Sequence, residues 1–173
     1  MSIVQAVLAV LLAVRPAASD AGESLDARTA RLERAAEEIA RTAEAYPGRE
    51  LETAAALVTL GVHETRFARY VARGCFDVPA GGADCDDGKA RSYFQVWAVG
   101  CPVLGVLPRG GKLELRAATS CAARIYWYGR RECNHVLGAF ARYAVGHGCS
   151  WSGAYDRAAT LRNVTRKLRA LAR

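Results

Sequence analysis

The six cysteines constrain this chain most, because their placement limits both its fold and the compartment in which it can fold. They lie at positions 75, 85, 101, 121, 133 and 149, and no two of them form a Cys-x-x-Cys pair. That spacing excludes zinc knuckles and thioredoxin-type redox sites. An even number of cysteines in a chain of 173 residues predicts three disulfides in an exported protein. Six buried thiols in a cytosolic protein are the alternative.

Geometry limits which cysteines can pair. Cys75 and Cys85 flank a loop rich in glycine and aspartate, so they can meet readily. Cys121 and Cys133 would lie about 18 Å apart on one helix, whereas the Cα atoms of a disulfide lie about 5.5 Å apart. The other two bonds are therefore either 101–121 with 133–149, or 101–133 with 121–149.

The N-terminal segment has the character of a signal peptide. Residues 3–14 are mostly apolar, which is too short to span a membrane but suits a signal-peptide core. Ala17 and Ser19 suit a cleavage site, although no Lys or Arg precedes the apolar run. We expect residues 1–19 to be a signal peptide and the protein to be exported, either periplasmic or extracellular. A short buried N-terminal helix is the alternative. No apolar run is long enough for an integral membrane protein.

Apolar periodicity predicts helices through most of the chain. Leu25, Leu32 and Ile39 recur every seven residues, and Ser24 can cap their helix. Residues 75–91 hold three glycines and four aspartates and predict a loop or short hairpin. Residues 92–99 are aromatic and β-branched and predict a strand turning into a helix. Further helices are expected over 50–73, 113–129, 135–145 and 152–171. The fold class is therefore mostly α, with one short β or loop insertion after the second helix.

The two halves of the chain differ in charge. Residues 1–88 carry 9 Lys and Arg against 14 Asp and Glu, a net charge of −5, whereas residues 89–173 carry 15 against 3, a net charge of +12. The basic half predicts a polyanionic partner or an anionic surface. In the last helix, an apolar stripe contains Leu161, Val164, Leu168 and Leu171. The expected outer face contains Arg157, Arg162, Arg166, Lys167, Arg169 and Arg173.

Glu64 lies in the middle of an apolar helical stripe. Burial disfavours the charged form of a carboxylate, so the pKa of Glu64 should rise, as a general acid near neutral pH requires. Gly61, one turn earlier, leaves room for a ligand to approach. A structural glutamate paired with one of the many arginines is the alternative. The apolar residues that share this stripe are Leu57, Leu60, Phe67 and Val71.

Three short segments carry a family resemblance. The string His63-Glu64-Thr65-Arg66-Phe67 is not a zinc-protease motif, because Phe67 replaces the second histidine. Glu64-Thr65-x-Phe67 instead resembles the Glu-Ser-x-Phe motif of the lysozyme-like lytic transglycosylases. Residues 90–96 resemble their Gly-Leu-Met-Gln segment, with Gln95 aligned and Ser92 in the glycine position. Residues 141–146 resemble their Ala-Tyr-Asn-Ala-Gly motif, with Tyr143 and Gly146 aligned. The resemblance spans about residues 50–165, and goose-type lysozymes share this framework.

The resemblance implies a fold and a chemistry. It implies a lysozyme-like α+β catalytic domain, which we place over 49–173, after the signal peptide over 1–19 and an N-terminal helix over 20–48 that the residues themselves predict. Glu64 would end a helix and donate a proton to the β-1,4 glycosidic bond of peptidoglycan. It would then act as the base that closes a 1,6-anhydro ring on N-acetylmuramic acid. Ser92, Gln95 and Tyr143 would bind the sugar. Neither a cofactor nor a metal is implied, and we expect a monomer that binds glycan strands of an anionic cell wall.

Three other functions compete with this one. A goose-type muramidase would need a second carboxylate to activate water, and the candidates are the loop residues Asp77, Asp84, Asp86 and Asp87. A non-catalytic, lysozyme-like wall-binding protein is favoured by Ser92 in place of glycine and by Ala144 in place of asparagine. A nucleic-acid-binding protein would explain the basic half. We expect no nucleic-acid partner, because the chain has no helix-turn-helix, zinc-finger or RNP pattern.

Overall fold

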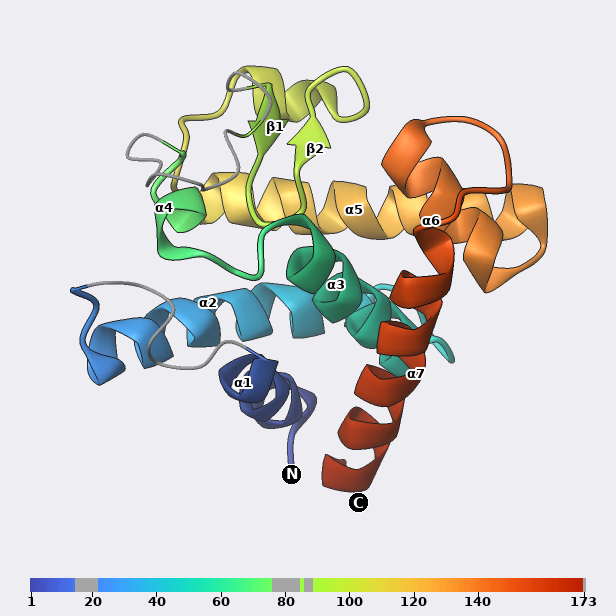
Figure 1. Cartoon of the computed structure of the whole chain (residues 1–173). Helices are drawn as coiled ribbons and strands as arrows, with labels where there is room; N and C mark the ends of the chain where they lie inside the picture. Colours follow the sequence, from blue (N-terminus) through green and yellow to red (C-terminus); the bar gives the residue numbers. More distant parts are fainter. Residues whose placement is uncertain (15–21, 76–84, 86–88, 173) are drawn as a thin grey trace.

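A computed structural model describes residues 1–14, 22–75, 85 and 89–172 (Figure 1). The fold is mostly α with a small β insertion, which confirms the predicted class. Within the described residues, seven α-helices accompany one two-stranded antiparallel sheet. The helices are α1 (Ile3–Val14), α2 (Leu25–Glu44), α3 (Glu50–Glu64), α4 (Arg69–Ala72), α5 (Lys112–Cys133), α6 (Val136–Val145) and α7 (Ala154–Leu171). The strands are β1 (Ala90–Arg91) and β2 (Val96–Trp97), followed by the 3-10 helix η2 (Pro102–Gly105).

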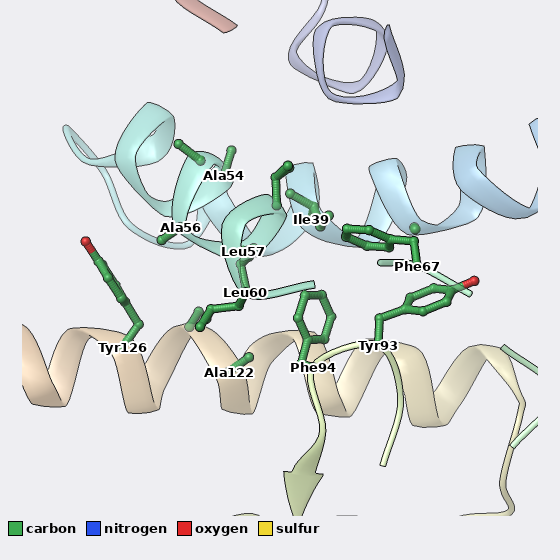
Figure 2. Close-up of a cluster of buried hydrophobic side chains, with 14 of the residues drawn as sticks. Ile39, Ala54, Ala56, Leu57, Leu60, Phe67, Tyr93, Phe94, Ala122 and Tyr126 are labelled. Carbon is green, nitrogen blue, oxygen red and sulfur yellow. The ribbon is translucent and has the colours of Figure 1, made fainter. Parts of the chain in front are cut away.

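One hydrophobic core joins all seven helices. Helix α5 crosses the molecule, with the small sheet on one side of it and α2 on the other (Figure 1). Figure 2 shows Phe67, Tyr93 and Phe94 gathered between α2 and α5 at one side of this core. Because α2 packs on both α3 and α5, it shares its core with the segment that follows.

The apolar run at the N-terminus forms α1, which packs against α2, α3 and α7. Its buried side chains are Ala6, Val7, Val10 and Leu11. This packing agrees with the alternative to a signal peptide, in which the apolar run is a short buried N-terminal helix. Ala17 and Ser19 lie outside the described residues, so cleavage of a signal peptide stays a prediction. No helix in the described part of the chain is both long and apolar enough to cross a membrane.

All six cysteines form disulfides. The predicted bond between Cys75 and Cys85 is confirmed. The other two bonds are Cys101–Cys121 and Cys133–Cys149, the first of the two pairings that the sequence left open. Helix α5 carries both Cys121 and Cys133, as the geometric argument required. Three internal disulfides are typical of proteins that fold in an oxidising compartment, which agrees with export.

The prediction of one continuous helix over 50–73 is wrong, because α3 ends at Glu64. The backbone N–H groups of Thr65 and Arg66 donate to the carbonyls of Gly61 and Val62 at 3.2 Å. Arg66 and Phe67 then adopt left-handed φ angles of 51° and 53°, which no helix continues. The fully buried Phe67 ring turns back onto Gly61. The space that Gly61 leaves is therefore filled by Phe67 and not by a ligand.

The expected strand and helix over 92–99 is instead a tight hairpin. Ala90 pairs with Trp97 and Arg91 with Val96, so residues 92–95 form the turn. Ser92 and Gln95 have φ angles of 61° and 49°. The two residues between them, Tyr93 and Phe94, are buried in the core, and this burial holds the turn in a conformation that L-residues adopt reluctantly.

Candidate functional site

A cleft of about 660 Å³ opens beside the carboxyl end of α3. Its walls come from Glu64, the segment 95–100, α5, the end of α6 and the segment 151–157. Three of the four predicted site residues, Glu64, Gln95 and Tyr143, line it together. The volume lies within the range of roughly 300–1,000 Å³ that is usual for ligand clefts.

Glu64 ends α3 and reaches α7 across the cleft. Its Oε1 accepts a hydrogen bond from the Arg157 guanidinium at 2.5 Å, and the side chains are 19% and 9% exposed. Arg157 also lies over the Trp151 ring, 4.9 Å from its centroid. The expectation that Arg157 lies on the outer face of α7 is therefore wrong. A pattern in the sequence marks its position, because Arg157 precedes Leu161, Val164 and Leu168 by four, seven and eleven residues and thus continues their apolar stripe.

Opposing influences act on the Glu64 carboxyl. Glu64 is partly buried at the carboxyl end of α3, where the helix dipole disfavours a negative charge. The Arg157 guanidinium favours the ionised form. Glu64 is therefore a carboxyl with a fixed cationic partner at the wall of a cleft, and this arrangement suits both a proton donor and a structural ion pair.

Two hydrogen bonds tie the three predicted motifs together. The Thr65 hydroxyl donates to the Tyr93 carbonyl at 3.0 Å, which joins the end of α3 to the hairpin turn. The Tyr143 hydroxyl donates to the Phe94 carbonyl at 2.7 Å, which joins α6 to the same turn. Burial raises the pKa of the Tyr143 phenol well above its ordinary value. Nearby Glu64 raises it further, and Arg157 opposes them. The phenol therefore stays protonated and holds the turn in place.

Gln95 and Ser92 lie at opposite ends of the turn. Gln95 lines the cleft, and its amide donates to the Ser92 carbonyl at 3.1 Å and contacts the Cys85 sulfur at 3.5 Å. Ser92 is buried and does not line the cleft. It borders a separate cavity of about 80 Å³ beside α2 and α5. Ser92 has a left-handed backbone at the position where the resembling family has glycine. Its side chain is not part of the cleft wall.

Apolar and aromatic side chains surround the opening of the cleft. Trp97, Val99, Tyr128 and Val145 all line it and are unusually exposed for residues of their size. Exposed aromatic rings at a cleft present flat apolar faces of the kind that pack on ligands with one apolar face. Trp97 follows the hairpin turn and Tyr128 lies on α5, so rings from two separate elements meet at the cleft.

His63, next to Glu64, contacts α7 but does not line the cleft. Its Nε2 lies 2.9 Å from the Thr160 hydroxyl. Burial lowers the pKa of His63, and the nearby Arg157 guanidinium lowers it further, so the imidazole is neutral near pH 7. His63 therefore packs as an uncharged neighbour of the ion pair.

The aspartates proposed for water activation, Asp77, Asp84, Asp86 and Asp87, lie outside the described residues. Within the described ones, no three His, Cys, Asp or Glu side chains gather as a metal site would require. Glu64 is the one carboxylate among the described residues that line the cleft.

Comparison with protein-family models finds none that matches this chain. No curated protein and no solved structure matches it either. The family resemblance therefore rests on the three sequence motifs alone.

Proposed function

We propose that this protein cleaves the β-1,4 bond between N-acetylmuramic acid and N-acetylglucosamine in peptidoglycan, as a lytic transglycosylase with Glu64 as acid and base. The observation that carries the proposal is the meeting of Glu64, Gln95 and Tyr143 at one cleft. These residues come from three separate segments, and each segment is hydrogen-bonded to the hairpin turn or belongs to it. The exposed aromatic residues at the cleft suit a sugar chain.

The reaction has two proton transfers. Glu64 first donates its proton to the bridging oxygen, the bond from that oxygen to C1 of N-acetylmuramic acid breaks, and C1 gains oxocarbenium character. The Glu64 carboxylate then takes the proton of the C6 hydroxyl, whose oxygen bonds to C1 and closes the 1,6-anhydro ring. Because Arg157 stabilises the carboxylate, it makes Glu64 a stronger acid in the first transfer and a weaker base in the second.

A non-catalytic wall-binding protein is the second candidate. The ion pair between Glu64 and Arg157 favours it, because a partly buried carboxylate held by a buried guanidinium is also how a structural glutamate looks. Such a protein would bind glycan at the cleft without cutting it.

Digestion of purified sacculi, followed by mass analysis of the soluble fragments, separates these candidates. Anhydro ends support the transglycosylase, and intact sacculi with bound protein support the binding protein. Reducing ends would indicate a muramidase. In that case, changing Asp77, Asp84, Asp86 and Asp87 singly to Asn should lower turnover at one position by at least about tenfold, or about 1.4 kcal/mol of barrier. If none of the four changes does so, no loop carboxylate activates water.

A further inference from the structure

A cationic surface lies next to the cleft and plays no part in the reaction described above. Two grooves of about 840 Å³ each form it, one along the second half of α5 and one between the start of α3 and α7. Both grooves include Arg49, Glu52 and Arg130, so they are one continuous surface. We call it the arginine surface. Its arginines are Arg49, Arg124, Arg130, Arg131, Arg162, Arg166 and Arg169.

The arginine surface holds most of the excess charge of the molecule. Seven arginines against the two lining glutamates, Glu50 and Glu52, give a net charge of +5, whereas the whole chain has +7. Six of the seven arginines are exposed, and Arg130, which pairs with Glu52 at 3.2 Å, is half-buried. Such a concentration of one sign attracts polyanions from solution. Guanidinium groups bind phosphate through paired N–H donors, which favours phosphate as the bound group.

Two of the three aromatic residues of this surface, Trp127 and Tyr128, carry guanidinium groups over their rings, and the third, Tyr46, stacks on Trp127 with 6.0 Å between the ring centroids. Arg49 lies 4.7 Å from the centroid of Trp127, and Arg131 lies 5.3 Å from that of Tyr128. Cation–π contact orients a guanidinium at low entropic cost, so these arginines are held in place for a ligand. Proteins that bind single-stranded nucleic acid need open rings on which bases stack. The occupied rings favour a polyanion without bases.

The arginine surface joins the cleft at Tyr128. This residue lines both the cleft and the α5 groove. Arg142, which lines the cleft, lies 5.2 Å from the same ring. A polymer bound to the arginine surface can therefore be continuous with a ligand bound at the cleft.

We propose that the arginine surface binds a linear phosphodiester polymer attached to the cell wall, and so holds the wall while the cleft engages its glycan. The choice of a wall polymer over a nucleic acid rests on the proposed function, on the three disulfides and on the occupied rings. The binding itself rests on the charge and geometry of the surface alone.

The test measures binding of the Glu64→Gln protein, which cannot digest its target, to sedimented walls. Walls are used with their phosphodiester polymers intact and after hydrofluoric acid has removed them. We expect at least about tenfold weaker binding to the stripped walls. The double variant Arg162→Gln/Arg169→Gln should weaken binding to intact walls several-fold. It should also reduce the slope of log K against log salt by roughly 1.4 to 1.8, because two phosphate contacts are lost.

The matched control is Lys89→Gln/Lys112→Gln, which removes the same charge from exposed positions outside both grooves and the cleft. Lys112 starts α5 and lies about 29 Å along that helix from Arg131. The control should bind as the parent does. Equal binding to stripped walls, or an equal loss in the control, would overturn the inference. Duplex DNA that binds as tightly as intact walls at equal salt would overturn it in favour of a nucleic acid.

Failure of this inference differs from failure of the proposed function. Cleavage of stripped walls by the wild-type protein, without any effect of the phosphodiester polymer on binding, rejects the arginine surface alone. If binding depends on the polymer but the wild-type protein cleaves no walls, the proposed enzymatic function is rejected and the proposed role of the arginine surface stands.

Discussion

At the residue scale, the site is built from two charged side chains that each interrupt an apolar stripe. Glu64 does so on α3 and Arg157 on α7, and the packing of these helices brings the two together. In the sequence, Glu64 stands out because apolar residues recur at helical spacing on both sides of it. The same rule marks Arg157, which continues the apolar stripe of α7, but the sequence does not show that it pairs with Glu64, 93 residues away, because only the packing of α3 on α7 makes the pair.

Replacing Arg157 tests what the ion pair does. In Arg157→Gln, the Glu64 carboxyl should keep its proton to higher pH, because the cation that favours the carboxylate is gone. A general acid works only while it is protonated, so the fall in kcat/KM at the alkaline side should move to higher pH. The pH profile of kcat/KM on sacculi measures this shift. Arg157→Lys, which keeps the charge, is the control and should return the profile towards that of the wild type. A uniform loss of activity with no shift would mean that Arg157 acts only in folding.

Gly61 and Phe67 set the position of Glu64. A Cβ at residue 61 would collide with the Phe67 ring, so Gly61→Ala should cost about 1–3 kcal/mol in the free energy of unfolding. Chemical denaturation measures this loss. Gly105→Ala is the control, because a Cβ there makes only an ordinary contact with the Ala98 Cβ at 3.8 Å, and it should change stability little. Equal stability of the two variants would show that the ring moves aside easily.

At the element scale, the long helices could be predicted from the sequence and the short connections could not. Helices α2, α5, α6 and α7 lie within a few residues of their expected ranges, and the Ser24 side chain caps α2 as predicted. The end of α3 was missed because neither glycine nor proline marks it. Arg66 and Phe67 have left-handed φ angles and stop the helix. Burial of the Phe67 ring holds this conformation, whereas the sequence pattern predicts Phe67 on the helix itself.

The disulfides give a prediction at this scale. Cys101–Cys121 and Cys133–Cys149 close segments of similar length, with sequence separations of 20 and 16. In the chain-entropy account, replacing either pair by serine should lower the free energy of unfolding by about 3 kcal/mol, with only about 0.2 kcal/mol between the two. Denaturation of both double variants measures the losses. A loss at one bond several times larger than at the other would show that native contacts, and not chain entropy, dominate.

At the scale of the whole molecule, one core places a cleft and a cationic surface side by side. The sequence predicted the charge asymmetry, but not that seven arginines from three regions of the chain would meet on one face. Three disulfides lie between Cys75 and Cys149, in the segment that supplies Gln95 and Tyr143 to the cleft and the α5 arginines to the arginine surface.

Export predicts the redox state of the complete protein. After expression with transport to an oxidising compartment, denatured but unreduced protein should have no reactive thiols, and six should appear after reduction. Labelling with a thiol reagent and intact-mass measurement count them. Six reactive thiols before reduction would contradict the assignment to an exported protein.

The central claim is that Glu64 is the acid of a glycan-cleaving site, and Glu64→Gln tests it most directly. The amide has nearly the same shape but carries no acid proton, so release of soluble fragments from sacculi should fall by about 10²-fold or more. Binding to sacculi should persist, and the melting temperature should stay near that of the wild type. Wild-type release of fragments by Glu64→Gln would contradict the account, because Glu64 would then be no more than the structural partner of Arg157.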